Sequence, residues 1–67
     1  MDLEKFLNNQ KTSYLAESYR RLEKEEEATK KMIETDPALA ELANGELESL
    51  VLQKNEIMKQ MEEIVKE

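Results

Sequence analysis

The sequence contains no cysteine, no histidine and no tryptophan, and it has one glycine and one proline among its 67 residues. Without cysteine the chain has no disulfide and no thiolate nucleophile, and the usual zinc sites lose their main ligand. Without histidine it lacks the commonest proton shuttle and metal ligand. A single glycine is too few for a glycine-rich phosphate loop or a dinucleotide fingerprint. We therefore expect no enzyme, no cofactor and no metal site in this segment.

Long apolar runs and an excess of basic residues are missing as well. No stretch approaches the ~18 apolar residues that suggest a membrane span. The N-terminus has no basic region followed by an apolar one, as a secretory signal would. The formal net charge of −6 disfavours general binding of nucleic acid through counterion release. We expect a soluble chain with neither a membrane partner nor a direct nucleic-acid site.

What is present favours helices. Charged residues make up 39% of the chain, and Glu, Lys, Leu and Ala dominate, which is typical of long helices and coiled coils. At this length the chain forms at most one small domain, or a piece of a longer protein. A core of this size predicts marginal stability unless a partner contributes.

The tripeptide Thr35-Asp36-Pro37 divides the chain into two helical halves. Aspartate is a preferred N-cap, and proline suits the first position of a helix. The same proline forces the preceding residue out of the α region, so an arriving helix should end at about Thr35. The sequence predicts an all-α fold, an antiparallel coiled-coil-like hairpin over 13–67 with helices at about 14–34 and 37–66. Residues 1–12 are expected to form a short helical segment and a loop, with Thr12 or Ser13 as the next N-cap.

Both long helices carry an inward stripe with alternating spacings of three and four residues. Apart from Glu26, which belongs to the first stripe, the acidic run 23–27 lies on the remaining face and reads as solvated surface. Gly45 is expected to sit inside a continuous second helix, at a cost of about 1 kcal/mol. The first stripe comprises Leu15, Tyr19, Leu22, Glu26, Thr29 and Ile33. The second comprises Ala43, Leu47, Leu50, Lys54, Ile57, Met61 and Ile64, with an extra row at Val51, Met58 and Val65.

A hairpin centred on Asp36 also predicts which residues lie opposite each other. Numbers summing to about 71 or 72 should face across the seam, which places Lys54 beside Glu17. Gly45 should face Glu26 at a thin, polar waist, where glycine allows close approach. The second helix is the longer one, and only Leu3, Phe6 and Leu7 are available to cover its overhang.

Two groups of residues are candidates for contact with a partner. The first is the only compact basic spot, which could meet an acidic partner or a phosphate. The second is the extra row of the wide apolar face, for which gap-filling core is the commoner role. The candidates are Arg20, Arg21 and Lys24 in the basic spot, and Val51, Met58 and Val65 in the extra row.

The segment 32–48, Met-Ile-Glu-Thr-Asp-Pro-Ala-Leu-Ala-Glu-Leu-Ala-Asn-Gly-Glu-Leu-Glu, resembles the N-terminal domain of class I peptide chain release factors of the bacterial or organellar type. In that family an acidic residue precedes Asp-Pro, Glu-Met/Leu-Ala and Glu-Leu follow, and a long helix comes next. The resemblance covers about residues 13–67. The chain departs from the family at its first helix, which is missing or reduced to residues 2–8, and at Gly45. The matching positions are Asp36, Pro37, Glu41, Leu42, Ala43, Glu46 and Leu47.

The resemblance implies a fragment of a factor that terminates translation at stop codons, in the cytoplasm or the mitochondrial matrix. The family's decoding loop and its Gly-Gly-Gln motif for peptidyl-tRNA hydrolysis lie in later domains, so no catalytic residue carries over. A docking or positioning role is implied, with the ribosome and the other domains of the same chain as partners. The alternative is a free-standing coiled-coil adaptor that dimerises through its second helix, and weak self-association is compatible with either.

Overall fold

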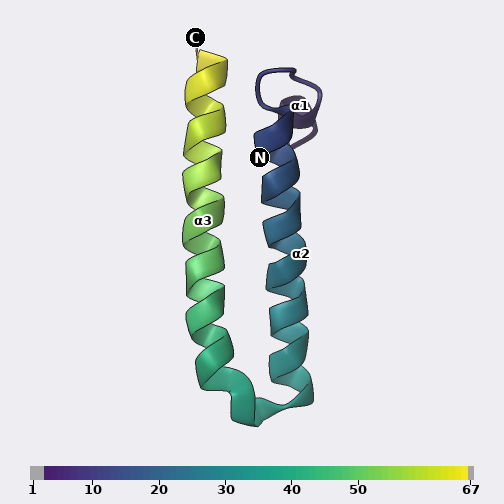
Figure 1. Ribbon diagram of the computed structural model, residues 1–67, viewed down its shortest axis with the longest axis vertical. Coiled ribbons are helices and arrows are strands. Elements are labelled where there is room, and N and C mark those ends of the chain that lie inside the picture. Colours follow the sequence, from purple (N-terminus) through teal and green to yellow (C-terminus); the bar gives the residue numbers. More distant parts are fainter. Residues whose placement is uncertain (1–2, 67) are drawn as a thin grey trace.

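The computed structural model describes residues 3–66, which fold into two long antiparallel helices and a short N-terminal one (Figure 1). The molecule is elongated, with extents of 46 × 16 × 16 Å. The predicted all-α hairpin is confirmed. Met1, Asp2 and Glu67 belong to the predicted segments 1–12 and 13–67 but lie outside the described residues. The elements are α1 (Leu3–Leu7), α2 (Ser13–Thr35), the 3-10 helix η1 (Pro37–Leu39) and α3 (Ala40–Lys66).

The turn between α2 and α3 follows the predicted capping at Asp36. Its backbone is extended, with φ −140° and ψ 91°, as expected before a proline. The Asp36 Oδ1 atom accepts a hydrogen bond from the Ala38 N–H at 3.1 Å, and the Asp36 N–H donates to the Met32 carbonyl at 2.9 Å. Asp36 thus closes one helix and caps the next. The first turn after it is a 3-10 helix over Pro37–Leu39, so α3 itself begins at Ala40 and not at Pro37.

This 3-10 turn makes the predicted register wrong. Lys54 lies against Glu26, with 3.3 Å between Lys54 Nζ and Glu26 Oε1, and not beside Glu17. The same ammonium is 5.4 Å from the centre of the Tyr19 ring. Lys54 therefore sits at about the level of Leu22. Because the connection extends through residue 39, the point of reversal moves beyond Asp36, and α3 shifts by about one helical turn relative to α2.

The two inward stripes lie in the seam as predicted. Every stripe position is buried or half-buried, including the polar positions Glu26 and Lys54. The hydroxyl of the buried Thr29 is satisfied, because its Oγ1 donates a hydrogen bond to the Glu25 carbonyl at 2.8 Å. Helical periodicity alone therefore identified which side of each long helix faces the other.

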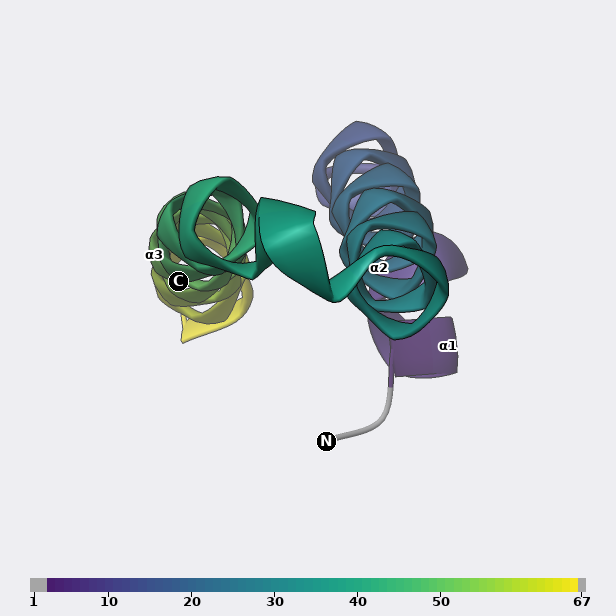
Figure 2. The ribbon, with the colours of Figure 1, turned by 90° about the horizontal axis from the view of Figure 1, so that it is seen from below.

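The short helix α1 packs beside α2 at the end where the C-terminus lies (Figure 2). Its Phe6 joins a buried cluster with Leu15, Ala16 and Met61, in which Ala16 and Met61 have no exposed surface. The predicted cover for the overhang of α3 is thus present. The remaining members of this contact region, all partly buried, are Leu3, Leu7, Tyr19, Ile57, Met58, Ile64 and Val65.

The turn between α1 and α2 is held by Thr12, but not as a side-chain cap. The Thr12 hydroxyl is fully buried and donates to the Phe6 carbonyl at 2.6 Å. Thr12 occupies the N-cap position of α2 without a side-chain hydrogen bond to the helix. The predicted N-cap position is therefore confirmed, but the hydroxyl satisfies a carbonyl of α1 instead of an N–H of α2. Thr12 ties α1 to the start of α2.

Gly45 lies inside a continuous α3, as predicted, but the thin waist is not there. A Cβ atom at this position would have no neighbour within 4 Å, and the residue is exposed. Close approach between the helices is therefore not the reason for glycine here. The shifted register and the outward direction of Gly45 both remove it from the seam.

Replacing Gly45 by alanine should therefore stabilise the protein. Alanine removes backbone freedom from the unfolded chain and fits the helical backbone without a clash. We expect the free energy of unfolding to rise by about 1 kcal/mol, and the melting midpoint by roughly 4–8 °C in a domain of this size. Circular dichroism at 222 nm during thermal melting measures both changes. A lower midpoint would mean that the open space around Gly45 is needed for something other than folding.

Candidate docking surface

The centre of the seam contains one ion pair whose partners are mostly shielded from water. Lys54 and Glu26 have side chains that are 16% and 14% exposed. Glu26 also accepts from Lys54 through Oε2 at 3.4 Å, and Lys30 approaches the Oε1 atom at 3.8 Å from the solvent side. A single carboxylate held by ammonium groups offers no acid–base pair for catalysis. The arrangement links α2 to α3 and fixes their offset.

Removing Lys54 should cost stability, because it leaves the Glu26 carboxylate in the seam with only Lys30 nearby. For Lys54→Met we expect the free energy of unfolding to fall by about 1–2 kcal/mol, less than for a fully buried pair. The double variant Lys54→Met/Glu26→Leu should recover most of that loss, since two apolar groups can replace a shielded ion pair. Urea titration followed by circular dichroism measures all three proteins.

The matched control for this pair is Lys30→Met, which removes the same charge from the exposed end of the network. The Lys30 side chain is 62% exposed, so its ion pair is expected to contribute less than 1 kcal/mol. An equal decrease in the free energy of unfolding for Lys30→Met and Lys54→Met would contradict a larger contribution from the Lys54–Glu26 pair.

The predicted basic spot is exposed on α2, but it is not purely basic. Arg20, Arg21 and Lys24 surround one shallow hollow together with Glu17. Arg20 and Lys24 also border a second hollow with three glutamates. The cations are therefore interleaved with carboxylates, and their field on a phosphate is weakened accordingly.

The predicted apolar row of Val51, Met58 and Val65 is exposed near the turn and half-buried toward the C-terminus. Met58 and Val65 pack against the Phe6 cluster and are half-buried. Val51 is 42% exposed and lies nearer the turn. Part of the surface of Met58 and Val65 is therefore covered within the chain, and contact of the remainder with a partner stays a prediction. Val51 remains available.

Val51 belongs to an open groove on the turn-side half of α3, which we call the α3 groove. It is a hollow of about 650 Å³ lined by residues of α3 alone. Leu52, at 69% exposed, forms its outer edge. Sequence reasoning missed Leu52 because it lies off the inward stripe. The available signal was its helical spacing, since Leu52 follows Glu48 by four residues and Asn44 by eight. The lining residues are Asn44, Leu47, Glu48, Val51 and Leu52.

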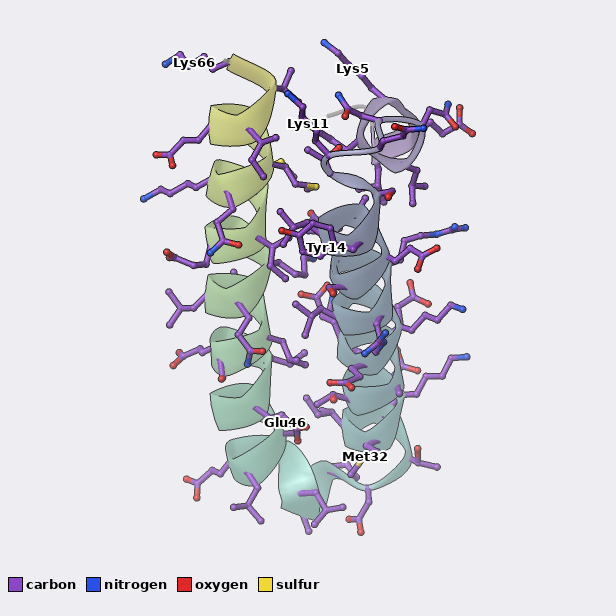
Figure 3. The ribbon with its side chains drawn as sticks, turned by 45° about the horizontal axis from the view of Figure 1, so that its top comes forward. Lys5, Lys11, Tyr14, Met32, Glu46 and Lys66 are labelled. Carbon is purple, nitrogen blue, oxygen red and sulfur yellow. The ribbon has the colours of Figure 1, made fainter. Side chains whose placement is uncertain are left out.

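Charge is distributed unevenly along the hairpin. The turn-side half, residues 26–50, holds seven carboxylates and two lysines, whereas the rest of the chain holds nine acidic and eight basic side chains. Figure 3 shows Met32 and Glu46 at the turn end, and Lys5, Lys11 and Lys66 at the opposite end. Almost all of the net charge of −6 therefore belongs to the half that carries the α3 groove.

Comparison of the chain with models of known protein families, with curated proteins and with solved structures found no match. Among residues 3–66, no helix combines the length and the apolar character that crossing a bilayer requires. Over the same residues, no three side chains of the types that ligate metals come together as a candidate site. The surface with the clearest physical character is thus the acidic, apolar-floored α3 groove.

Proposed function

We propose that this chain is the N-terminal helical domain of a class I peptide chain release factor, with a docking or positioning role in translation termination. The observation that carries the proposal is the helix reversal at Asp36-Pro37, the point where the sequence resemblance to that family is most specific. There Asp36 ends α2 and caps the following turn within a hairpin of two long helices. Asp36 and Pro37, the most specific of the matching residues, form this reversal, and that supports the proposal.

Under this proposal the segment performs no catalysis of its own. Release chemistry belongs to a Gly-Gly-Gln motif in a later domain, and the hairpin positions or docks the whole factor on the ribosome. The protein would act in the cytoplasm, or in the mitochondrial matrix if it is organellar. Its partners would be the ribosome and the other domains of the same chain.

The coding sequence downstream of residue 67 provides the first test. The proposal expects an open reading frame that continues in frame and encodes Gly-Gly-Gln within the next few hundred residues. A stop codon soon after residue 67, or a long downstream region without that motif, would refute it. A functional test follows in a release factor whose own N-terminal hairpin is replaced by residues 13–66, with stop-codon-dependent peptide release as the readout.

A second candidate function is a free-standing adaptor that dimerises through α3. The observation favouring it is the exposed apolar part of the α3 groove lining, since Val51 and Leu52 are uncovered in the single chain. Sedimentation equilibrium distinguishes the two candidates in part. A tight dimer at micromolar concentration that Leu52→Lys dissociates would support the adaptor, whereas a monomer would remove it.

A further inference from the structure

We propose that the α3 groove binds a cationic amphipathic helix presented by a partner protein. The inference deepens the docking role proposed above, and it depends on that role for the cellular setting in which the partner is met. Three properties of the described residues support it: the spacing of the lining, the position of α1, and the charge of the surrounding half of the hairpin.

The spacing of the lining residues suits a helix. Asn44, Leu47, Glu48 and Val51 follow one another at intervals of three, one and three, so they form one strip over about two turns of α3. Leu47 is half-buried and supplies a fixed floor, while the exposed Leu52 forms a rim. Helix-in-groove recognition uses apolar anchors spaced three, four and seven residues apart on the incoming helix. A strip of this length accommodates two or three such anchors.

The position of α1 indicates how such a helix would lie. On the C-terminal half of α3, Lys5 and Phe6 of α1 border a hollow with Glu62 and Val65. Val65 and Val51 belong to the same row of α3, two heptads apart, so the occupied and the open parts share one flank. Lys5 and Phe6 of the short helix thus border one end of that flank, and the turn end is open. A helix bound in the α3 groove would continue the layer that α1 begins.

The charge of the surrounding half selects a cationic partner. No lysine or arginine occurs from residue 32 to residue 53, and this stretch holds five carboxylates, among them Glu48 in the groove lining. Of the cations that flank the stretch, Lys54 is engaged by Glu26 and Lys30 lies 3.8 Å from the same carboxylate, whereas Lys31 is exposed on α2. Lysine or arginine side chains flanking an apolar stripe would meet these carboxylates at the rim, where complementary charge raises the association rate and selects partners.

The same charges argue against the other occupants. A second copy of this chain would bring its own acidic turn-side half to the same place, and like charges across an interface are unfavourable. Nucleic acid and anionic lipid surfaces are repelled for the same reason. The apolar floor and the acidic rim are satisfied together only by a helix that is apolar on one side and basic at its edges.

A direct binding experiment on the isolated chain tests the inference. The probe is a fluorescently labelled synthetic helical peptide with a leucine stripe flanked by lysines, and its matched controls carry glutamine or glutamate in place of every lysine. Fluorescence anisotropy should show binding of the lysine peptide, weaker binding of the glutamine peptide and none of the glutamate peptide. Amide chemical shifts should move at the five lining residues of the α3 groove.

Two pairs of matched variants locate the site. Leu52→Ala should weaken binding by about fivefold or more, as for an anchor contact, whereas Leu42→Ala, the same change at an exposed leucine outside the groove, should not. Glu48→Lys should weaken binding by about tenfold at low ionic strength, and Glu56→Lys, the same reversal elsewhere on α3, by much less. All four side chains are exposed, so the variants should fold.

Several outcomes would overturn the inference. Equal binding of the lysine and glutamine peptides would mean that apolar contact alone determines the affinity. An equal loss of affinity in the two variants of each matched pair would mean that binding depends on the net charge of the chain and not on the α3 groove. A dimer of this chain whose interface is the α3 groove would assign the groove to a second copy. None of these results depends on ribosomes or on a downstream Gly-Gly-Gln, so the inference and the proposed function can fail separately.

Discussion

Replacing Met61 by alanine is expected to lower the free energy of unfolding by about 3 kcal/mol. Met61 has no exposed surface and packs in the cluster with Phe6, Leu15 and Ala16, where all three helices meet. Truncation removes apolar contacts from α1, α2 and α3 at once. In a chain of 67 residues with a small core, a loss of this size is a large fraction of the total stability. Urea unfolding followed at 222 nm measures it.

The control for this variant uses the same chemical change on the surface. Met32 is 49% exposed near the turn, so Met32→Ala should change the free energy of unfolding by less than about 0.5 kcal/mol. Met61→Leu conserves volume and should cost less than about 1.5 kcal/mol, which keeps the comparison informative if Met61→Ala does not fold. Similar decreases in the free energy of unfolding for Met61→Ala and Met32→Ala would contradict the packing of the three helices around Met61.

Replacing Phe6 by alanine should cost a similar amount, about 3 kcal/mol, through a different element. Phe6 is 8% exposed and is the side chain by which α1 enters the cluster. A five-residue helix has no stability of its own, since isolated helices of that length do not form in water. Loss of the phenyl ring should therefore release α1 as well as weaken the core. Hydrogen exchange of the Asn8 amide, which donates to the Glu4 carbonyl, should speed up more than exchange in the middle of α2.

Tyr14→Ala serves as the comparison for Phe6→Ala, because Tyr14 is an aromatic residue of the next helix that is 64% exposed. Its loss is expected to change the free energy of unfolding by less than about 0.5 kcal/mol. An unchanged melting midpoint in Phe6→Ala would refute the docking of α1 on the end of α3.

The location of α1 also bears on the proposed binding function. Met58 and Val65 pack against the cluster that Phe6 of α1 joins, so the turn-side half of α3 is the more open part of the apolar flank. The same half carries most of the net negative charge. The buried cluster that contains Phe6 and Met61 thus lies at the end away from the turn, whereas the proposed binding surface is on the turn-side half.

Most of the fold was predictable, because its determinants are local. The inward stripes, from Leu15 to Ile33 and from Ala43 to Ile64, follow from the period of the α-helix alone. The reversal at Asp36 follows from the steric restriction that Pro37 imposes and from the capping chemistry of aspartate. The candidate site was predictable only in part: Val51 is exposed in the α3 groove, but Leu52 was missed, and Met58 and Val65 are half-buried.

By itself, the sequence determined which segments are helical, where the chain reverses and which face of each helix is inward. Only the tertiary structure decided the offset between the helices, the pairing of Lys54 with Glu26, and which part of the apolar flank stays open. The reason is that helical period and capping act within a few residues of one segment. The offset depends instead on how many residues the turn uses, and the 3-10 helix at Pro37–Leu39 moved it by about one helical turn. Met58 and Val65 pack against the cluster that contains Phe6, and Val51 does not. This difference likewise depends on where the five-residue helix α1 finds enough apolar surface to pack.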